Sequence, residues 1–139
     1  MKSLLGKLGV LFIGLLILGN AEVWGADWKF YDSNELYLGY YDAQGITRPS
    51  KNIVRVWIRR DFTEKGVLDV VGKIGKKYKN LSYGIGLVEI DCVEKTIRNL
   101  SLTYYDNKGK VIYSSSSPTE WDFIVPDSEG EKLYKEVCK

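Results

Sequence analysis

Alternation of apolar and polar side chains predicts β-strands along most of this chain. Between residues 53 and 60 every second position is valine or isoleucine, and the positions between them carry Arg55, Trp57 and Arg59. A period of two places one set of side chains on each side of a strand. We therefore expect a half-buried strand with an apolar core face and a second face that presents an aromatic ring between two guanidinium groups.

Five further segments are rich in β-branched and aromatic residues and are bounded by turn-forming residues. They cover residues 28–31, 36–41, 83–91, 96–105 and 110–114. The connection at residues 106–109 reads Asp-Asn-Lys-Gly, a strong turn sequence. Consecutive strands joined by short turns pair antiparallel, so the pattern predicts an antiparallel sheet of about six strands.

The apolar spacing changes to three and four between residues 63 and 79, which predicts a helix with Thr63 as its N-cap. Three glycines inside this segment would each destabilise a helix by about 1 kcal/mol relative to alanine. The helix must therefore depend on packing against the rest of the protein. One continuous helix and an interrupted one both fit this pattern.

A second helix is expected at the C-terminus. Ser128 and Glu131 have the spacing of a capping box, and the helix that they begin would end near Cys138. Together these elements predict an α+β fold in which an antiparallel sheet carries a C-terminal helix and a second helix.

The N-terminus has the pattern of an export signal: two lysines, an apolar run from residue 8 to residue 18, and small residues up to Ala21. We expect cleavage after Ala21, with residues 22–139 forming a single domain that carries 18 basic and 18 acidic side chains. A permanent anchor is the alternative, although the run is well short of the roughly 20 residues that span a bilayer. No lipidation cysteine is seen near the expected cut.

The chain has two cysteines and no histidine. In an exported protein, one disulfide between Cys92 and Cys138 is the simplest state, and two free thiols are the alternative. The absence of histidine excludes the Ser-His-Asp and Cys-His nucleophilic sites and any histidine zinc site. We expect no cofactor and no metal.

Two clusters of charged residues could carry chemistry. Glu89 and Asp91 lie two apart on an expected strand, the arrangement of an acid and base pair, but a solvated strand face is the simpler interpretation. Four lysines surround Tyr78 at positions 73, 76, 77 and 79 and could contact phosphates while the ring stacks on a base. Because residues 22–139 carry no net charge, we interpret these lysines as a solvated helix surface and expect no nucleic-acid partner.

Aromatic residues are abundant, with ten tyrosines, four tryptophans and four phenylalanines. Tyrosine and tryptophan on a surface favour partner binding because each offers a large rigid area with a polar tip. Arg55, Trp57 and Arg59 form the best candidate for such a surface. In the alternative arrangement a helix covers Trp57, and the arginines only extend from beneath it.

Taken in chain order, a set of short motifs resembles the bacterial surface-adhesin protein E family over nearly the whole of residues 22–139. The most specific motifs are Glu89-Ile90-Asp91-Cys92, Trp121 with Pro126 and Ser128, and Val137-Cys138; looser matches include Asp27-Trp28, Tyr40-Tyr41-Asp42 and Gly130-Glu131. The resemblance implies an antiparallel sheet with a packed helix, a Cys92–Cys138 disulfide and export in a Gram-negative bacterium.

The adhesin for which the family is named binds host matrix proteins and self-associates. The resemblance therefore implies a protein partner, from the extracellular matrix or the envelope, and leaves a homodimer open. We expect a non-enzymatic binding or adhesion module, periplasmic or at the cell surface, that recognises its partner through the surface of Arg55, Trp57 and Arg59. A structural or accessory subunit of an envelope assembly is the alternative, and an enzyme acting through Glu89 and Asp91 comes third.

Overall fold

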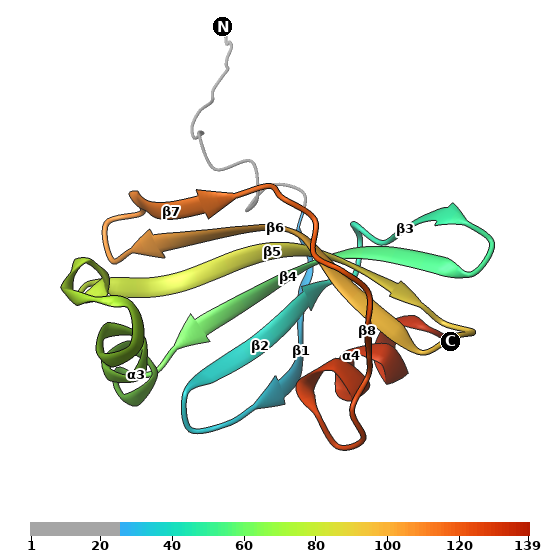
Figure 1. The fold of residues 1–139 in the computed structure, drawn as a ribbon, viewed down its shortest axis with the longest axis horizontal. Coiled ribbons are helices and arrows are strands. Elements are labelled where there is room, and N and C mark those ends of the chain that lie inside the picture. Colours follow the sequence, from blue (N-terminus) through green and yellow to red (C-terminus); the bar gives the residue numbers. More distant parts are fainter. Residues whose placement is uncertain (1–25) are drawn as a thin grey trace, which may run out of the picture.

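A computed structural model describes residues 26–139 as an antiparallel sheet with one helix at its end and a second helix packed against one face (Figure 1). The expected α+β fold is confirmed. The expected signal sequence, residues 1–21, lies outside the described residues. Within residues 26–139 no helix combines the length and the apolar character needed to span a membrane.

The sheet has eight strands, and six of them form a continuous order β1-β2-β4-β5-β6-β7 with β3 added beside β4 and β8 beside β6. The strands are β1 (Trp28–Ser33), β2 (Tyr37–Asp42), β3 (Thr47–Ser50), β4 (Ile53–Phe62), β5 (Leu81–Asp91), β6 (Thr96–Asp106), β7 (Val111–Ser115) and β8 (Asp122–Phe123). The six expected strands are those of the continuous order. The sequence did not indicate β3, because its four exposed residues are three polar ones and Pro49, and proline is tolerated only at a sheet edge.

The core lies on one face of β4 and β5, where alternate side chains are buried as the pattern predicted. Helix α4 (Glu129–Val137) packs on this face through Leu133 and Val137. The most deeply buried side chains are Val54, Val56, Val88, Ile90 and Leu133. Each such side chain, from two strands and one helix, stabilises the fold by about 1.5–3 kcal/mol through its burial.

Specific contacts hold both ends of α4: a cap at the N-terminus and a disulfide at the C-terminus. At its N-terminus the Ser128 hydroxyl accepts a hydrogen bond from the Glu131 amide at 3.2 Å, which confirms Ser128 as the cap. The Glu131 carboxylate reaches back to the amide of Asp127 at 2.9 Å, one residue before the cap. At its C-terminus the expected disulfide joins Cys138 to Cys92 at the end of β5.

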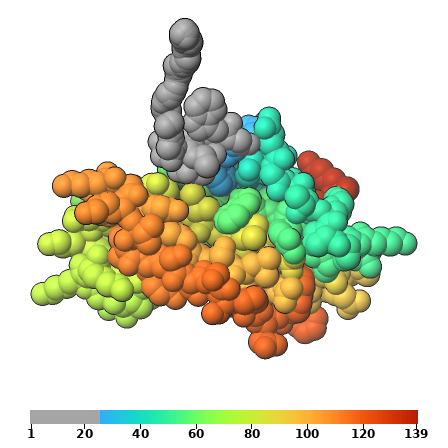
Figure 2. All heavy atoms as spheres, turned by 90° about the horizontal axis from the view of Figure 1, so that it is seen from above, coloured from blue at the N-terminus to red at the C-terminus, as the bar shows by residue number. Residues whose placement is uncertain are grey.

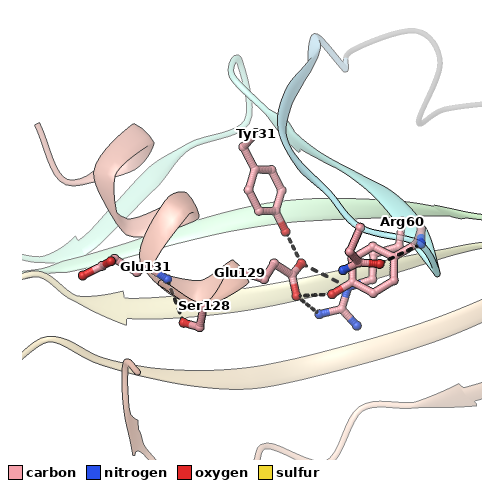
Figure 3. A network of polar contacts seen from close by, with 7 residues as sticks. Tyr31, Arg60, Ser128, Glu129 and Glu131 are labelled. Atoms are coloured by element: carbon pink, nitrogen blue, oxygen red, sulfur yellow. Dashed lines mark hydrogen bonds and ion pairs between the residues drawn. The ribbon is translucent and has the colours of Figure 1, made fainter. Parts of the chain in front are cut away.

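A polar network also holds the first turn of α4 against the sheet (Figure 3). The Glu129 carboxylate accepts hydrogen bonds from the hydroxyls of Tyr31 and Tyr37 and from two nitrogens of the Arg60 guanidinium. Burial, reinforced by the negative charge of Glu129, raises the pKa of Tyr31 far above its usual value. Tyr31 therefore remains a hydrogen-bond donor across the physiological pH range.

The expected helix over residues 63–79 is interrupted. Helix α3 (Glu64–Ile74) ends at Gly75, whose φ of 121° favours glycine, and a 3₁₀ turn, η2 (Lys76–Tyr78), follows. The break explains why the apolar residues of this segment do not all face the protein: Tyr78 is buried, whereas Ile74 is 56% exposed. In a continuous helix Tyr78, four residues after Ile74, would lie on the same exposed side as Ile74 and would not pack against the sheet.

Helix α3 begins on the hairpin between β1 and β2. The amide of Thr63 donates to the carbonyl of Leu36 at 2.9 Å, and the Thr63 hydroxyl donates to the carbonyl of Glu35 at 2.7 Å. Thr63 also caps the helix, as expected, by accepting from the amide of Gly66 at 3.0 Å. A Cβ atom on Gly66 would lie 1.9 Å from the Leu36 carbonyl oxygen, so this close approach requires glycine.

Candidate functional site

The sheet face opposite α4 presents Trp57 to solvent. The Trp57 side chain is 40% exposed, whereas its neighbours Val56 and Ile58 are buried beneath α4. Neither α3 nor α4 covers Trp57. Of the two arrangements that the sequence allowed, the structure therefore has the one with an exposed ring.

Arg55 and Arg98 lie in one row across this face with Glu89 between them. The register pairs Arg55 of β4 with Glu89 of β5, and Glu89 with Arg98 of β6. Each guanidinium binds one carboxylate oxygen through Nε and Nη2, at 2.9 and 2.7 Å for Arg55 and at 3.0 and 2.8 Å for Arg98. Glu89 is 3% exposed, so two rigidly held arginines cover one buried carboxylate.

Arg98 also lies over the ring of Trp121, with its guanidinium carbon 4.7 Å from the ring centre. Trp121 immediately precedes β8, which pairs with the start of β6 and so brings this ring beside Arg98. Sequence reasoning assigned neither residue to the site. Arg98 and Trp121 lie 23 positions apart; the pairing of β8 with β6 and the hydrogen bonds between Asn99 and Thr119 bring them together.

Arg59 is held at the other side of Trp57. Its Nε donates to Asp61 at 2.7 Å, and its guanidinium lies 4.1 Å from the centre of the Tyr83 ring. Tyr83 in turn stacks on Tyr105, with ring centres 4.7 Å apart. The two expected guanidinium groups therefore flank Trp57, and each is held by partners of its own.

Glu89 and Asp91 do not form an acid and base pair. Burial alone would raise the pKa of Glu89, but the hydrogen bonds and positive charges of Arg55 and Arg98 outweigh it, and the pKa is lowered. Asp91 accepts hydrogen bonds from the amides of Val93 and Glu94 and shapes the turn after β5. Both carboxylates have structural partners, which removes the support for the enzymatic alternative.

Other parts of the described chain are weaker candidates for a functional site. Tyr78 is 4% exposed, so its ring is not accessible to a nucleic-acid base. A pocket of about 40 Å³ beside the Glu129 network is lined by Arg60, Asn99 and Leu133 among others. It has room for a few water molecules, far less than the roughly 300 Å³ of a typical ligand site. Within residues 26–139 no group of acidic or cysteine side chains is arranged to hold a metal ion.

Comparison with known proteins gives the chain a family. The model of the family described as surface-adhesin protein E matches residues 28–139. A solved structure described as that of Haemophilus influenzae protein E matches with a TM-score of 0.48 and 13% sequence identity, covering 78% of this chain and 87% of that chain. No curated protein sequence matches. Because the family model covers β1 to the end of α4, the chain belongs to the surface-adhesin protein E family.

Proposed function

We propose that this protein is an exported, non-enzymatic adhesion module that binds a protein partner on the sheet face around Trp57. The observation that carries the proposal is the exposure of this large ring in the middle of β4, on a face that neither helix covers. Tryptophan and arginine are the residues that most often dominate binding energy at protein interfaces. Membership of an adhesin family supports the same function.

The fixed arginines indicate the chemistry of the partner. Arg55 and Arg98 share one carboxylate, so this row carries a net positive charge, and the Nη1 atoms of both make no hydrogen bond within residues 26–139. A fixed planar donor loses little conformational entropy when it binds a carboxylate. We therefore expect a partner surface that is acidic or aromatic, on a matrix protein or on another protein of the envelope.

The location follows from the same reasoning. Adhesion requires that the Trp57 face reach a partner outside the cytoplasm, and the disulfide between Cys92 and Cys138 suits an oxidising compartment. We place the protein in the periplasm or at the cell surface. The expected signal sequence, residues 1–21, would direct it there.

Capture of partners by the immobilised, oxidised protein tests this proposal. Envelope extract and purified matrix proteins would be applied separately, and bound proteins identified by mass spectrometry. Trp57→Ala should weaken capture by a factor of about 30 or more, the usual cost of truncating a central tryptophan. Its melting temperature should stay close to that of the wild type because the ring is not part of the core.

Tyr113→Ala provides the matched control, since Tyr113 is 41% exposed but lies on the other side of the sheet, beside Tyr104. It should capture partners as the wild type does. Equal capture by the folded Trp57→Ala variant, or no capture from either source by the wild type, would contradict the proposal. Arg55→Ala is a poorer probe, because it would leave the buried Glu89 with one of its two partners.

A further inference from the structure

The end of the sheet farthest from α4 forms a second surface. Helix α3, η2 and the turn between β6 and β7 lie together there (Figure 1), and in Figure 2 their yellow-green and orange atoms are neighbours at one end of the molecule. The amide of Asn107 in the turn donates to the carbonyl of Asn80 after η2 at 3.0 Å. We call residues 63–80 and 106–110 the basic tip.

The basic tip concentrates positive charge. It holds seven lysines and three acidic residues, a net charge of +4, while the remainder of residues 26–139 carries −3. Two of the lysines are paired with acidic residues: Lys73 with Asp69 at 3.2 Å and Lys65 with Glu35 at 3.0 Å. The other five make no ion pair within residues 26–139; they are Lys76, Lys77, Lys79, Lys108 and Lys110.

The tip also exposes two large apolar side chains. Leu68 is 66% exposed and Ile74 is 56% exposed, both on α3, whose Gly66 faces the hairpin between β1 and β2. On α3 itself the lysines are Lys65 and Lys73; the other five lie on η2, just after it, and in the β6–β7 turn, so neighbouring segments supply the basic and the apolar side chains of the tip. A surface that combines exposed leucine or isoleucine with many lysines is typical of segments that lie in a membrane interface. Lysine stems allow the charged ends to reach lipid headgroups while the apolar side chains enter the boundary below them.

The break at Gly75 creates this arrangement. The positive φ of Gly75 turns the chain so that Tyr78 enters the protein while Lys76 and Lys77 remain exposed. The ammonium group of Lys77 lies 5.3 Å from the centre of the Tyr78 ring and 5.9 Å from the centre of the Tyr113 ring. The two lysines of η2 therefore follow directly after the end of α3 that carries Ile74.

We propose that the basic tip docks on an anionic lipid surface, with its lysines against headgroup phosphates and with Leu68 and Ile74 in the interfacial layer. Charge complementarity carries the proposal: five exposed lysines that make no ion pair within the described chain lie on the same tip as two exposed apolar side chains. The tip lies at the end of the sheet and Trp57 on its face, so docking is separate from the proposed partner binding.

Co-sedimentation with vesicles tests the docking. The protein should bind vesicles of phosphatidylcholine containing phosphatidylglycerol and not vesicles of phosphatidylcholine alone. Because each lysine near such a surface strengthens binding about fivefold, a triple variant with Lys76, Lys77 and Lys79 changed to glutamine should bind about 100-fold more weakly. The control changes Lys29, Lys51 and Lys135 to glutamine, an equal loss of charge at exposed positions outside the tip, and should bind within about threefold of the wild type.

A second variant, Leu68→Ser with Ile74→Ser, separates lipid docking from binding of a soluble polyanion. It should bind anionic vesicles about tenfold more weakly and bind dextran sulfate as the wild type does. Equal binding to neutral vesicles, equal losses in the two lysine variants, or an unchanged vesicle affinity of the serine variant would overturn the proposal; the last result would make the tip a polyanion site. Circular dichroism of each variant confirms that the substitutions at exposed positions leave the fold intact.

Discussion

The guanidinium of Arg60 on β4 holds the carboxylate of Glu129, the first residue of α4, through hydrogen bonds of 3.1 Å from Nε and 2.6 Å from Nη2. The two residues are 69 positions apart in the chain. The same carboxylate accepts from Tyr31 and Tyr37, so one acidic side chain connects β1, β2 and β4 to the helix. This connection fixes the N-terminal end of α4, and the disulfide fixes the other.

Glu129→Gln should lower the free energy of unfolding by about 2–3 kcal/mol. The change removes the charge that Arg60 binds and leaves fewer acceptors for the two tyrosines. The cost is smaller than for a fully buried pair because the Arg60 side chain is 33% exposed. Urea denaturation followed by tryptophan fluorescence measures the change.

Glu131→Gln is the matched control for this prediction. It removes the same charge from the same first turn of α4, but the partners of the Glu131 carboxylate, the Asp127 amide and Lys135, both lie outside the sheet. Its effect should stay below about 0.5 kcal/mol. Similar losses for the two variants would mean that the network seen in Figure 3 contributes nothing beyond helix capping.

Stability should fall above about pH 10 in a way that depends on Tyr31. In the unfolded chain a tyrosine loses its proton near pH 10, whereas the raised pKa keeps Tyr31 protonated in the folded protein. The unfolded state therefore loses this proton first, and the stabilisation that is fully present below about pH 10 is lost as the pH rises. The free energy of unfolding of the wild type should decrease more steeply above this pH than that of Tyr31→Phe, and parallel curves would exclude a role for Tyr31.

Two glycines of α3 should respond to alanine in opposite directions. Gly66→Ala should destabilise the protein by about 2–3 kcal/mol, because its Cβ would overlap the Leu36 carbonyl and separate the helix from the hairpin. A Cβ atom on Gly72 would meet nothing within 4 Å apart from the nearby backbone of its own helix, so Gly72→Ala should stabilise by about 0.5–1 kcal/mol through its higher helix propensity. Thermal unfolding distinguishes the two results, and a loss of stability in both would mean that α3 is placed differently.

Replacing both cysteines with serine should lower the free energy of unfolding by about 4 kcal/mol, since the disulfide closes a loop across 46 positions. Intact-mass analysis should show the wild type two hydrogens lighter than its reduced form. Reduction should destabilise the wild type and leave the serine variant unchanged. Two alkylatable thiols in the native protein would contradict the disulfide.

Elements with a local cause could be predicted from the amino-acid sequence. Alternation along β4 placed Trp57 opposite the core, and Ser128 and Thr63 marked the starts of both helices, because strand faces and caps depend on residues within a few positions. The disulfide followed from there being one pair of cysteines in an exported chain. The motifs also indicated the family.

The surroundings of those elements depend on the tertiary structure. Glu89 is buried between Arg55 and Arg98 because three strands align these positions, and Trp121 meets Arg98 because β8 pairs with β6. The exposure of Trp57 depended on which face of the sheet α4 covers. The break at Gly75 depended on the burial of Tyr78. These outcomes depend on contacts between residues distant in the chain, and local spacing carries no information about such contacts.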